Sequence, residues 1–306
     1  MEEEPRIVGL LVLYVKDMHR ERRIMPYIHA QDGTRLFYST WGTGEPVLFI
    51  HGGNVGSGVW DFQVPALVAK GFECITYDQR GFDRSDVSAT DYSIGTLAGD
   101  LDALIGHLDR PNLSAVTLSF GGCVLARYLK QYGSEQVKRA ALVSTVAPFP
   151  CRSEDNPDGL DPEQAYEPFL RGMIEDRAQT FLDSLDLFFN PEGAENPVTE
   201  GARTWIMNFG LRNPLVSMLE IYRASFFEGV RADMSAFTMP TLLVHGEADV
   251  FAPLTATAAC AQRMIFDGRL ITYPGASHGL MFTHRNRLNR DLGEFLKSAL
   301  ERRSAA

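Results

Sequence analysis

Short apolar segments alternate along this chain with longer amphipathic ones. Continuous apolar segments of four to six residues are typical of strands that are buried on both faces. Between several of them apolar residues recur at helical spacing, as in 58–70 and 93–108. This alternation predicts an α/β fold, a mostly parallel central sheet flanked by helices. The predicted strands lie at 46–50, 73–77, 115–118, 139–143, 241–245 and 270–273.

The start of the sheet is predicted to contain a hairpin. Residues 34–41 alternate between apolar and polar side chains, and the Gly-Thr-Gly sequence at 42–44 is typical of a turn. The apolar strand at 46–50 follows directly. We therefore expect the two strands to pair with each other.

One interval between predicted strands is too long for a simple connection. Almost a hundred residues separate 139–143 from 241–245, whereas a crossover needs only about a dozen. Apolar residues recur at helical spacing within this interval, and Pro191, Pro197 and Pro214 divide its helical part into pieces. We predict a helical cap at 148–235, inserted into a core of 25–147 and 236–306. Such a cap would cover the carboxyl ends of the strands, where open α/β sheets bind ligands.

Residues 1–24 are predicted to be an N-terminal extension. They contain an apolar segment at 7–15 that is too short to span a bilayer, and it follows acidic residues rather than the basic start of a signal peptide. Met25 precedes the first domain-like pattern. The extension is either an added helix or strand, or upstream sequence from a misplaced start.

Composition narrows the class of protein. The 306 residues are 45% hydrophobic and 22% charged, as in soluble globular proteins. The net charge is −10 without long runs of either sign, which argues against partners such as nucleic acid or an anionic membrane. The four cysteines are far apart and form no metal-binding pattern, so we expect reduced thiols, a cytoplasmic location and no metal site.

The strongest chemical signal is Ser119, which lies between the strand at 115–118 and an amphipathic helix. At such a corner a serine hydroxyl is exposed as a nucleophile, and the N–H of Phe120 becomes an oxyanion donor. Gly121 suits the tight turn. Thr117 stands where the G-x-S-x-G pattern has its first glycine. Taken alone, this segment is also compatible with an ordinary strand–turn–helix junction.

Three further strand ends carry candidate residues. Gly53 follows the strand at 46–50 and offers a second oxyanion N–H. Asp249 and Glu247 follow the strand at 241–245, and we favour Asp249 because the longer arm of Glu247 would have to fold back. His278 follows the last strand. A lone loop histidine is usually a surface residue, but the order serine, acid, histidine is that of one catalytic-triad architecture.

Two other histidines lie near these segments. His51 is predicted to support the loop at Gly53. His245 ends its strand without a partner that the sequence identifies.

From about residue 27 to 300 the chain resembles the α/β-hydrolase superfamily. Residues 100–108, the Ser119 turn, 126–128 and 277–284 resemble its cofactor-free haloperoxidase and arylesterase branch. The resemblance implies ester hydrolysis, often with peracid formation from carboxylic acids and hydrogen peroxide. It also implies a triad of Ser119, Asp249 and His278, with Gly53 and Phe120 as oxyanion donors.

The chain also departs from that branch. The branch has a bulky aromatic residue and then a proline, which favours peracid formation, where this chain has Gly53 and Asn54. The segments 51–53 and 78–81 resemble proline iminopeptidases instead. Those enzymes carry tryptophan after the serine, whereas this chain has Phe120.

We predict a serine hydrolase that cleaves small, largely apolar carboxylic esters through an acyl-enzyme, without a metal or organic cofactor. The expected partner is a small-molecule ester or lactone. The alternatives are a lactonase or a perhydrolase/haloperoxidase with the same triad, an aminopeptidase like the proline iminopeptidases, and a small-ligand receptor on a hydrolase scaffold.

Overall fold

The structure, a computed structural model, describes residues 26–88 and 91–304. The predicted N-terminal extension of residues 1–24 therefore lies outside the described residues. Within them, no helix is long and apolar enough to cross a membrane.

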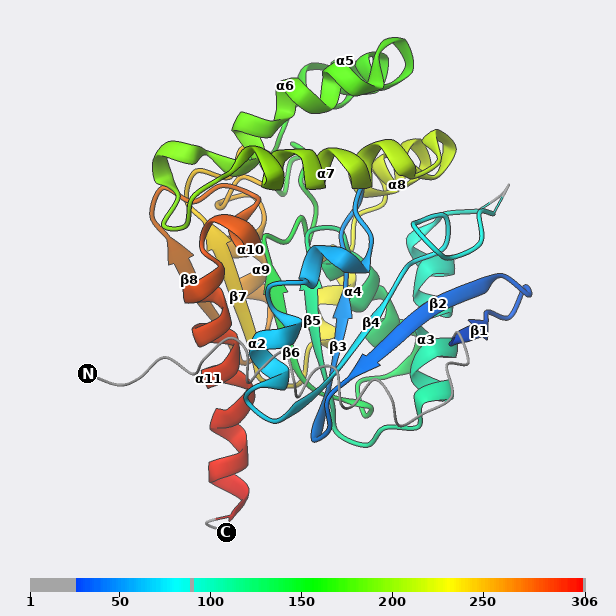
Figure 1. Cartoon of the computed structure of the whole chain (residues 1–306), viewed down its shortest axis with the longest axis vertical. Coiled ribbons are helices and arrows are strands. Elements are labelled where there is room, and N and C mark those ends of the chain that lie inside the picture. Colours follow the sequence, from blue (N-terminus) through cyan, green and yellow to red (C-terminus); the bar gives the residue numbers. More distant parts are fainter. Residues whose placement is uncertain (1–25, 89–90, 305–306) are drawn as a thin grey trace.

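The described chain forms one sheet of eight strands in the order β1-β2-β4-β3-β5-β6-β7-β8 (Figure 1). Strands β1 and β2 and strands β2 and β4 pair antiparallel, and all other neighbours are parallel. The predicted α/β fold with a mostly parallel sheet is thus confirmed. The strands are β1 (Tyr27–His29), β2 (Arg35–Trp41), β3 (Glu45–Ile50), β4 (Phe72–Tyr77), β5 (Leu113–Leu118), β6 (Val137–Val143), β7 (Thr241–Gly246) and β8 (Gly268–Tyr273).

The predicted hairpin between β2 and β3 is wrong. The chain does turn between these strands, but β4 lies between them and pairs with both. A Cβ added to Gly42 would lie 2.7 Å from the carbonyl oxygen of Phe72, and one added to Gly44 would lie 2.0 Å from that of Gly71. The turn therefore wraps around the start of β4, and its glycines permit this close approach.

Apolar residues on the two faces of the sheet form two core layers. In β3, Leu48 and Ile50 belong to one layer, and Val47 and Phe49 belong to the other, as the two-residue period of a strand requires. The first layer includes α3 (Ile94–Leu108), α4 (Gly121–Tyr132) and α9 (Ala258–Met264). The second includes η1 (Ser57–Trp60), α2 (Val64–Val68), α10 (Leu280–Thr283) and α11 (Arg285–Ser304).

Four α-helices, which we call the inserted helices, lie between β6 and β7. Figure 1 shows them above the carboxyl ends of the parallel strands, with α7 and α8 nearer the sheet than α5 and α6. Local sequence sets where they begin: Asp161, Asp176 and Thr199 each accept a backbone N–H at the first turn of a helix. The segment comprises α5 (Pro162–Glu175), α6 (Arg177–Phe189), η2 (Pro191–Gly193), α7 (Glu200–Arg212), α8 (Leu215–Phe227) and η3 (Arg231–Ala236).

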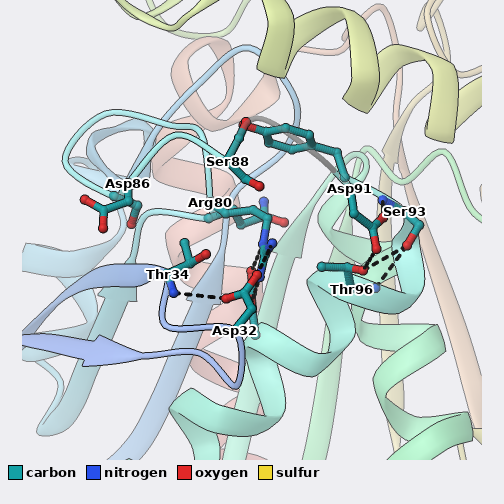
Figure 2. A network of polar contacts seen from close by, with 12 residues as sticks. Asp32, Thr34, Arg80, Asp86, Ser88, Asp91, Ser93 and Thr96 are labelled. Atoms are coloured by element: carbon teal, nitrogen blue, oxygen red, sulfur yellow. Dashed lines mark hydrogen bonds and ion pairs between the residues drawn. The ribbon is translucent and has the colours of Figure 1, made fainter.

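A network of ion pairs joins the loop after β4 to helix α3 and to the β1–β2 turn. Arg80 binds Asp100 of α3 at 2.6 Å. It also binds Asp32 of the β1–β2 turn at 2.9 Å (Figure 2). Only 2% of the Arg80 side chain and 3% of the Asp100 side chain are exposed. Burial raises the pKa of Asp100 although Arg80 opposes this effect. Arg80 therefore offsets part of the cost of burying the charge of Asp100.

We expect Arg80→Met to lower the free energy of unfolding by about 3 to 5 kcal/mol, because it leaves the Asp100 carboxylate buried without its partner. The exposed pair of Arg35 and Asp86 provides a matched control, and Arg35→Met should change the free energy of unfolding little, because solvent screens this pair. Urea unfolding followed by circular dichroism measures both. Equal losses in the two variants would show that burial does not strengthen the Arg80 network.

Candidate active site

Ser119 lies at a sharp turn between β5 and α4. Its backbone is in the left-handed region, with φ 51°, which residues other than glycine rarely adopt. Its N–H donates to the carbonyl oxygen of Val143 at 2.9 Å, so β6 holds the turn. Ser119 is partly exposed, although every residue of β5 is buried. The turn therefore presents this serine at the edge of the sheet.

Three glycines allow the surrounding segments to approach this turn. A Cβ on Gly121 would lie 2.7 Å from the Ile50 carbonyl oxygen, and one on Gly52 would lie 2.9 Å from the Cβ of Ser119. A Cβ on Gly122 would lie 2.4 Å from Thr145 Oγ1. Real Cβ atoms are not found at such distances, so a side chain at any of the three positions would displace the turn.

Thr117 stands in place of the usual glycine and is fully buried. Its Oγ1 would be 3.5 Å from a Cβ on Gly122, an ordinary contact distance. The Thr117 side chain therefore packs beside the start of α4 without a close contact to Gly122.

Asp249 and His278 meet at the ends of β7 and β8. His278 Nδ1 donates to Asp249 Oδ2 at 2.8 Å. The other carboxylate oxygen, Oδ1, accepts the N–H groups of Phe251 and Ala252 at 3.0 and 2.9 Å. Glu247 is exposed and instead accepts a hydrogen bond from Thr272 at 2.7 Å. Of the two carboxylates considered from the sequence, Asp249 is the one that contacts the histidine.

The surroundings of Asp249 favour its charged form. Burial opposes ionisation, but His278, His245 and the Ala252 N–H outweigh it and lower the pKa of Asp249. An ionised Asp249 accepts the proton on Nδ1 of His278 and so leaves Nε2 of a neutral ring as the basic nitrogen. This is the tautomer that a general base needs.

Consecutive residues at the end of β6 link the serine turn to the histidine loop. Val143 accepts the Ser119 N–H, and the next residue, Ser144, donates its hydroxyl to the carbonyl oxygen of His278 at 3.0 Å. Ser144 is fully buried and has φ 45°. The sequence analysis missed Ser144, although a polar residue directly after a buried strand was a signal that could have identified it.

His51 lies beneath the loop that contains Gly53. The backbone N–H of Gln79 donates to His51 Nε2 at 2.9 Å, so the ring proton is on Nδ1, which donates to the Gly52 carbonyl oxygen at 2.7 Å. Burial lowers the pKa of His51 and keeps the ring neutral. Because the Gly52 carbonyl and the Gly53 N–H belong to one peptide group, His51 fixes the direction of that N–H.

The N–H groups of Gly53 and Phe120 are the candidate oxyanion donors. In the described loops and turns, neither group donates a hydrogen bond to another residue. Both residues follow the carboxyl ends of adjacent parallel strands, β3 and β5.

The inserted helices contact the loops on both sides of the site. Ile221 of α8 lies 3.2 Å from where a Cβ on Gly53 would be, and the Tyr222 hydroxyl accepts a hydrogen bond from the side chain of Asn54. At the end of α6, the ring of Phe188 lies 6.0 Å from that of His278. The Phe188 carbonyl accepts the Gly279 N–H at 2.8 Å.

A cavity of about 510 Å³ lies elsewhere, between α7 and the edge formed by β2, η1 and α2. Trp41, Trp205 and Arg212 contribute to its walls, but none of the five candidate residues does. This cavity is therefore separate from the space next to Ser119.

Comparison with known proteins identifies the family. The model of the α/β-hydrolase fold family matches residues 45–285. The chain is 32% identical over 274 residues to the non-heme chloroperoxidase CPO-A1 of Kitasatospora aureofaciens. The alignment covers 89% of this chain and 99% of the relative. The protein belongs to the α/β-hydrolase family, and its relatives lie in the haloperoxidase and esterase branch.

Two further relatives connect this branch with ester chemistry. The bifunctional esterase/perhydrolase DCH of Acinetobacter calcoaceticus is 29% identical over 281 residues, 90% of this chain and all of that one. The structure of an esterase from Exiguobacterium antarcticum superposes with a TM-score of 0.84 at 25% identity, and covers 90% of this chain and all of that one. The chain is thus an α/β hydrolase whose relatives are named haloperoxidases and esterases.

Proposed function

We propose that this protein is a serine hydrolase that cleaves carboxylic esters, with Ser119 as nucleophile, His278 as general base and Asp249 as the carboxylate that orients it. The observation that supports the proposal is the Asp249–His278 pair: Ser144 donates to the His278 carbonyl and directly follows Val143, which accepts the Ser119 N–H. The esterase names of two relatives support it.

In the proposed reaction, Ser119 Oγ attacks the ester carbonyl while His278 Nε2 accepts the hydroxyl proton. The N–H groups of Gly53 and Phe120 stabilise the negative charge on the tetrahedral oxyanion. The imidazolium then donates its proton to the departing alcohol oxygen, and an acyl-enzyme remains. Water, deprotonated by His278, attacks the acyl group and releases the carboxylic acid and free Ser119.

The inserted helices are proposed to form a cap at 148–235 on a core of 25–147 and 236–306. Ile221, Tyr222, Phe188 and Asn190 are among the side chains that contact the loops at Gly53 and His278, and none of the four carries a charge at neutral pH. An uncharged wall of this kind favours an uncharged ester or lactone over the protonated amine of an aminopeptidase substrate. A cytoplasmic location stays a prediction of the sequence.

The loop at Asn54 favours hydrolysis over peracid formation. Asn54 has φ 63°, whereas proline is confined to a φ near −65°, so a proline could not take this backbone conformation. Ile221 also occupies the space into which an aromatic side chain at position 53 would extend. The aromatic residue and proline that the resembled branch has at positions 53 and 54 are therefore replaced by a different local structure.

The test is a series of p-nitrophenyl esters of increasing acyl length, with a lactone and proline p-nitroanilide included. Burial of one more methylene contributes up to about 0.8 kcal/mol, so kcat/KM should rise by up to about fourfold per methylene and then fall when the pocket is full. Faster turnover of the anilide than of every ester would contradict the esterase proposal. Labelling of Ser119 by a fluorophosphonate without turnover of any ester would favour a receptor.

A further inference from the structure

His245 is a fully buried histidine in β7, four residues before Asp249. Its Nε2 lies 2.7 Å from the carbonyl oxygen of Ala252. A carbonyl oxygen only accepts, so the proton of His245 is on Nε2 and is donated to Ala252. The same nitrogen lies 3.4 Å from Asp249 Oδ2, the oxygen that also accepts the Nδ1 proton of His278.

These contacts place His245 against the turn that holds the Asp249 carboxylate. The Ala252 N–H donates to Asp249 Oδ1 at 2.9 Å, while the Ala252 carbonyl accepts from His245. Ala252 is therefore held on both sides. The ring of His245 joins the turn at 249–252 to the strand β7, and its positive N–H end faces Oδ2.

The environment of His245 keeps its ring neutral. Burial lowers its pKa, which Asp249 and the Ala252 carbonyl oppose, and His278 lowers it further. Within the described part of the chain, the other ring nitrogen, Nδ1, is buried without a hydrogen-bond partner. A neutral ring with its proton on Nε2 is therefore a fixed donor and does not exchange protons during catalysis.

We propose that His245 is a positioning residue for the catalytic acid: its Nε2–H holds the Ala252 carbonyl, and with it the Asp249 turn, where Oδ2 meets His278. This proposal rests on the proposed function and adds to it a residue that contacts neither the serine nor the substrate. The sequence pattern that indicates Ser119, Asp249 and His278 does not indicate a role or a partner for His245.

The experiment compares His245→Phe, which fills the site without a donor, with His245→Gln, whose amide can still donate to Ala252. For a p-nitrophenyl ester we expect the phenylalanine variant to lose roughly tenfold or more in kcat, because the Ala252 carbonyl then keeps only the longer hydrogen bond from Thr257 at 3.2 Å, while KM stays unchanged. The glutamine variant should recover most of the rate, and His29→Gln, at an exposed histidine, is the control.

An unchanged kcat in His245→Phe, or an equal loss in the glutamine variant, would overturn the proposal. Nitrogen NMR of the wild-type protein gives a test that does not depend on folding of the variants. It should show His245 neutral and protonated at Nε2 throughout the active pH range, and a cationic ring or an Nδ1 tautomer would also overturn it. Fluorophosphonate labelling of wild-type Ser119 is measured in parallel, because its failure would contradict the proposed function and leave the His245 tautomer readable.

Discussion

Replacement of Ser119 by alanine is expected to lower kcat for esters by about 10⁶-fold, because the variant lacks the oxygen that forms the acyl-enzyme. The small rate that remains over the uncatalysed reaction would come from substrate binding and the oxyanion donors. The loss is measured by the hydrolysis of p-nitrophenyl acetate, at an enzyme concentration high enough for the residual rate of the variant to be detected. KM should change little if the hydroxyl acts mainly in the transition state.

A matched control for this experiment is Ser235→Ala, at an exposed serine in η3. It should keep full activity and full labelling by a fluorophosphonate, whereas Ser119→Ala should not be labelled. Because Ser119 has a left-handed backbone, the alanine variant also requires a thermal unfolding measurement to show that the turn persists. If the folded variant retained more than a few per cent of the activity, Ser119 could not be the nucleophile.

Asp249→Asn is expected to lower kcat by about 10⁴-fold, because an amide that donates toward Nδ1 selects the wrong tautomer of His278. Glu247→Gln is the natural control, since Glu247 is exposed and bonds Thr272 rather than the histidine. It should leave kcat close to that of the wild-type protein. Comparison of the two variants at one pH, with the same ester, separates the two carboxylates.

The acid dependence of stability adds a second readout on Asp249. Its pKa is lowered in the folded protein, so its ionised form contributes stability at neutral pH that is lost as the pH falls through the folded value. The wild-type protein should therefore lose stability on acidification more steeply than Asp249→Asn.

A larger catalytic loss at Glu247 than at Asp249 would reverse the assignment.

The sequence could predict the main lines of the fold because burial leaves a strong pattern. Strand β3 is buried from Pro46 to Ile50 and appears in the sequence as an unbroken apolar segment, and β5 and β7 are buried along their whole length and mostly apolar. Helix α3 begins within one residue of the predicted 93–108. The pairing of β2 could not be predicted, because the turn at 42–44 has the same local signals whether β3 or β4 becomes the neighbour.

The candidate site depended on the order of residues at strand ends. Ser119, Asp249 and His278 each follow an apolar strand, and the carboxyl ends of parallel strands meet at one edge of a sheet. Their order and location were therefore readable without coordinates. The comparisons place the chain in a family with this fold, whereas the catalytic roles of these residues remain proposals that the variants above test.

By itself, the sequence determined the fold class, the position of the inserted helices and the segments from which the candidate residues come. Only the tertiary structure decided which carboxylate contacts His278, how Thr117 fits beside Gly122, and that Ser144 and His245 support the site. Each of these features depends on atoms that come within hydrogen-bond or contact distance only in the folded protein. Most of these atoms belong to segments that are far apart in the chain. Local hydrophobic patterns report burial and periodicity, but they carry no record of such distances.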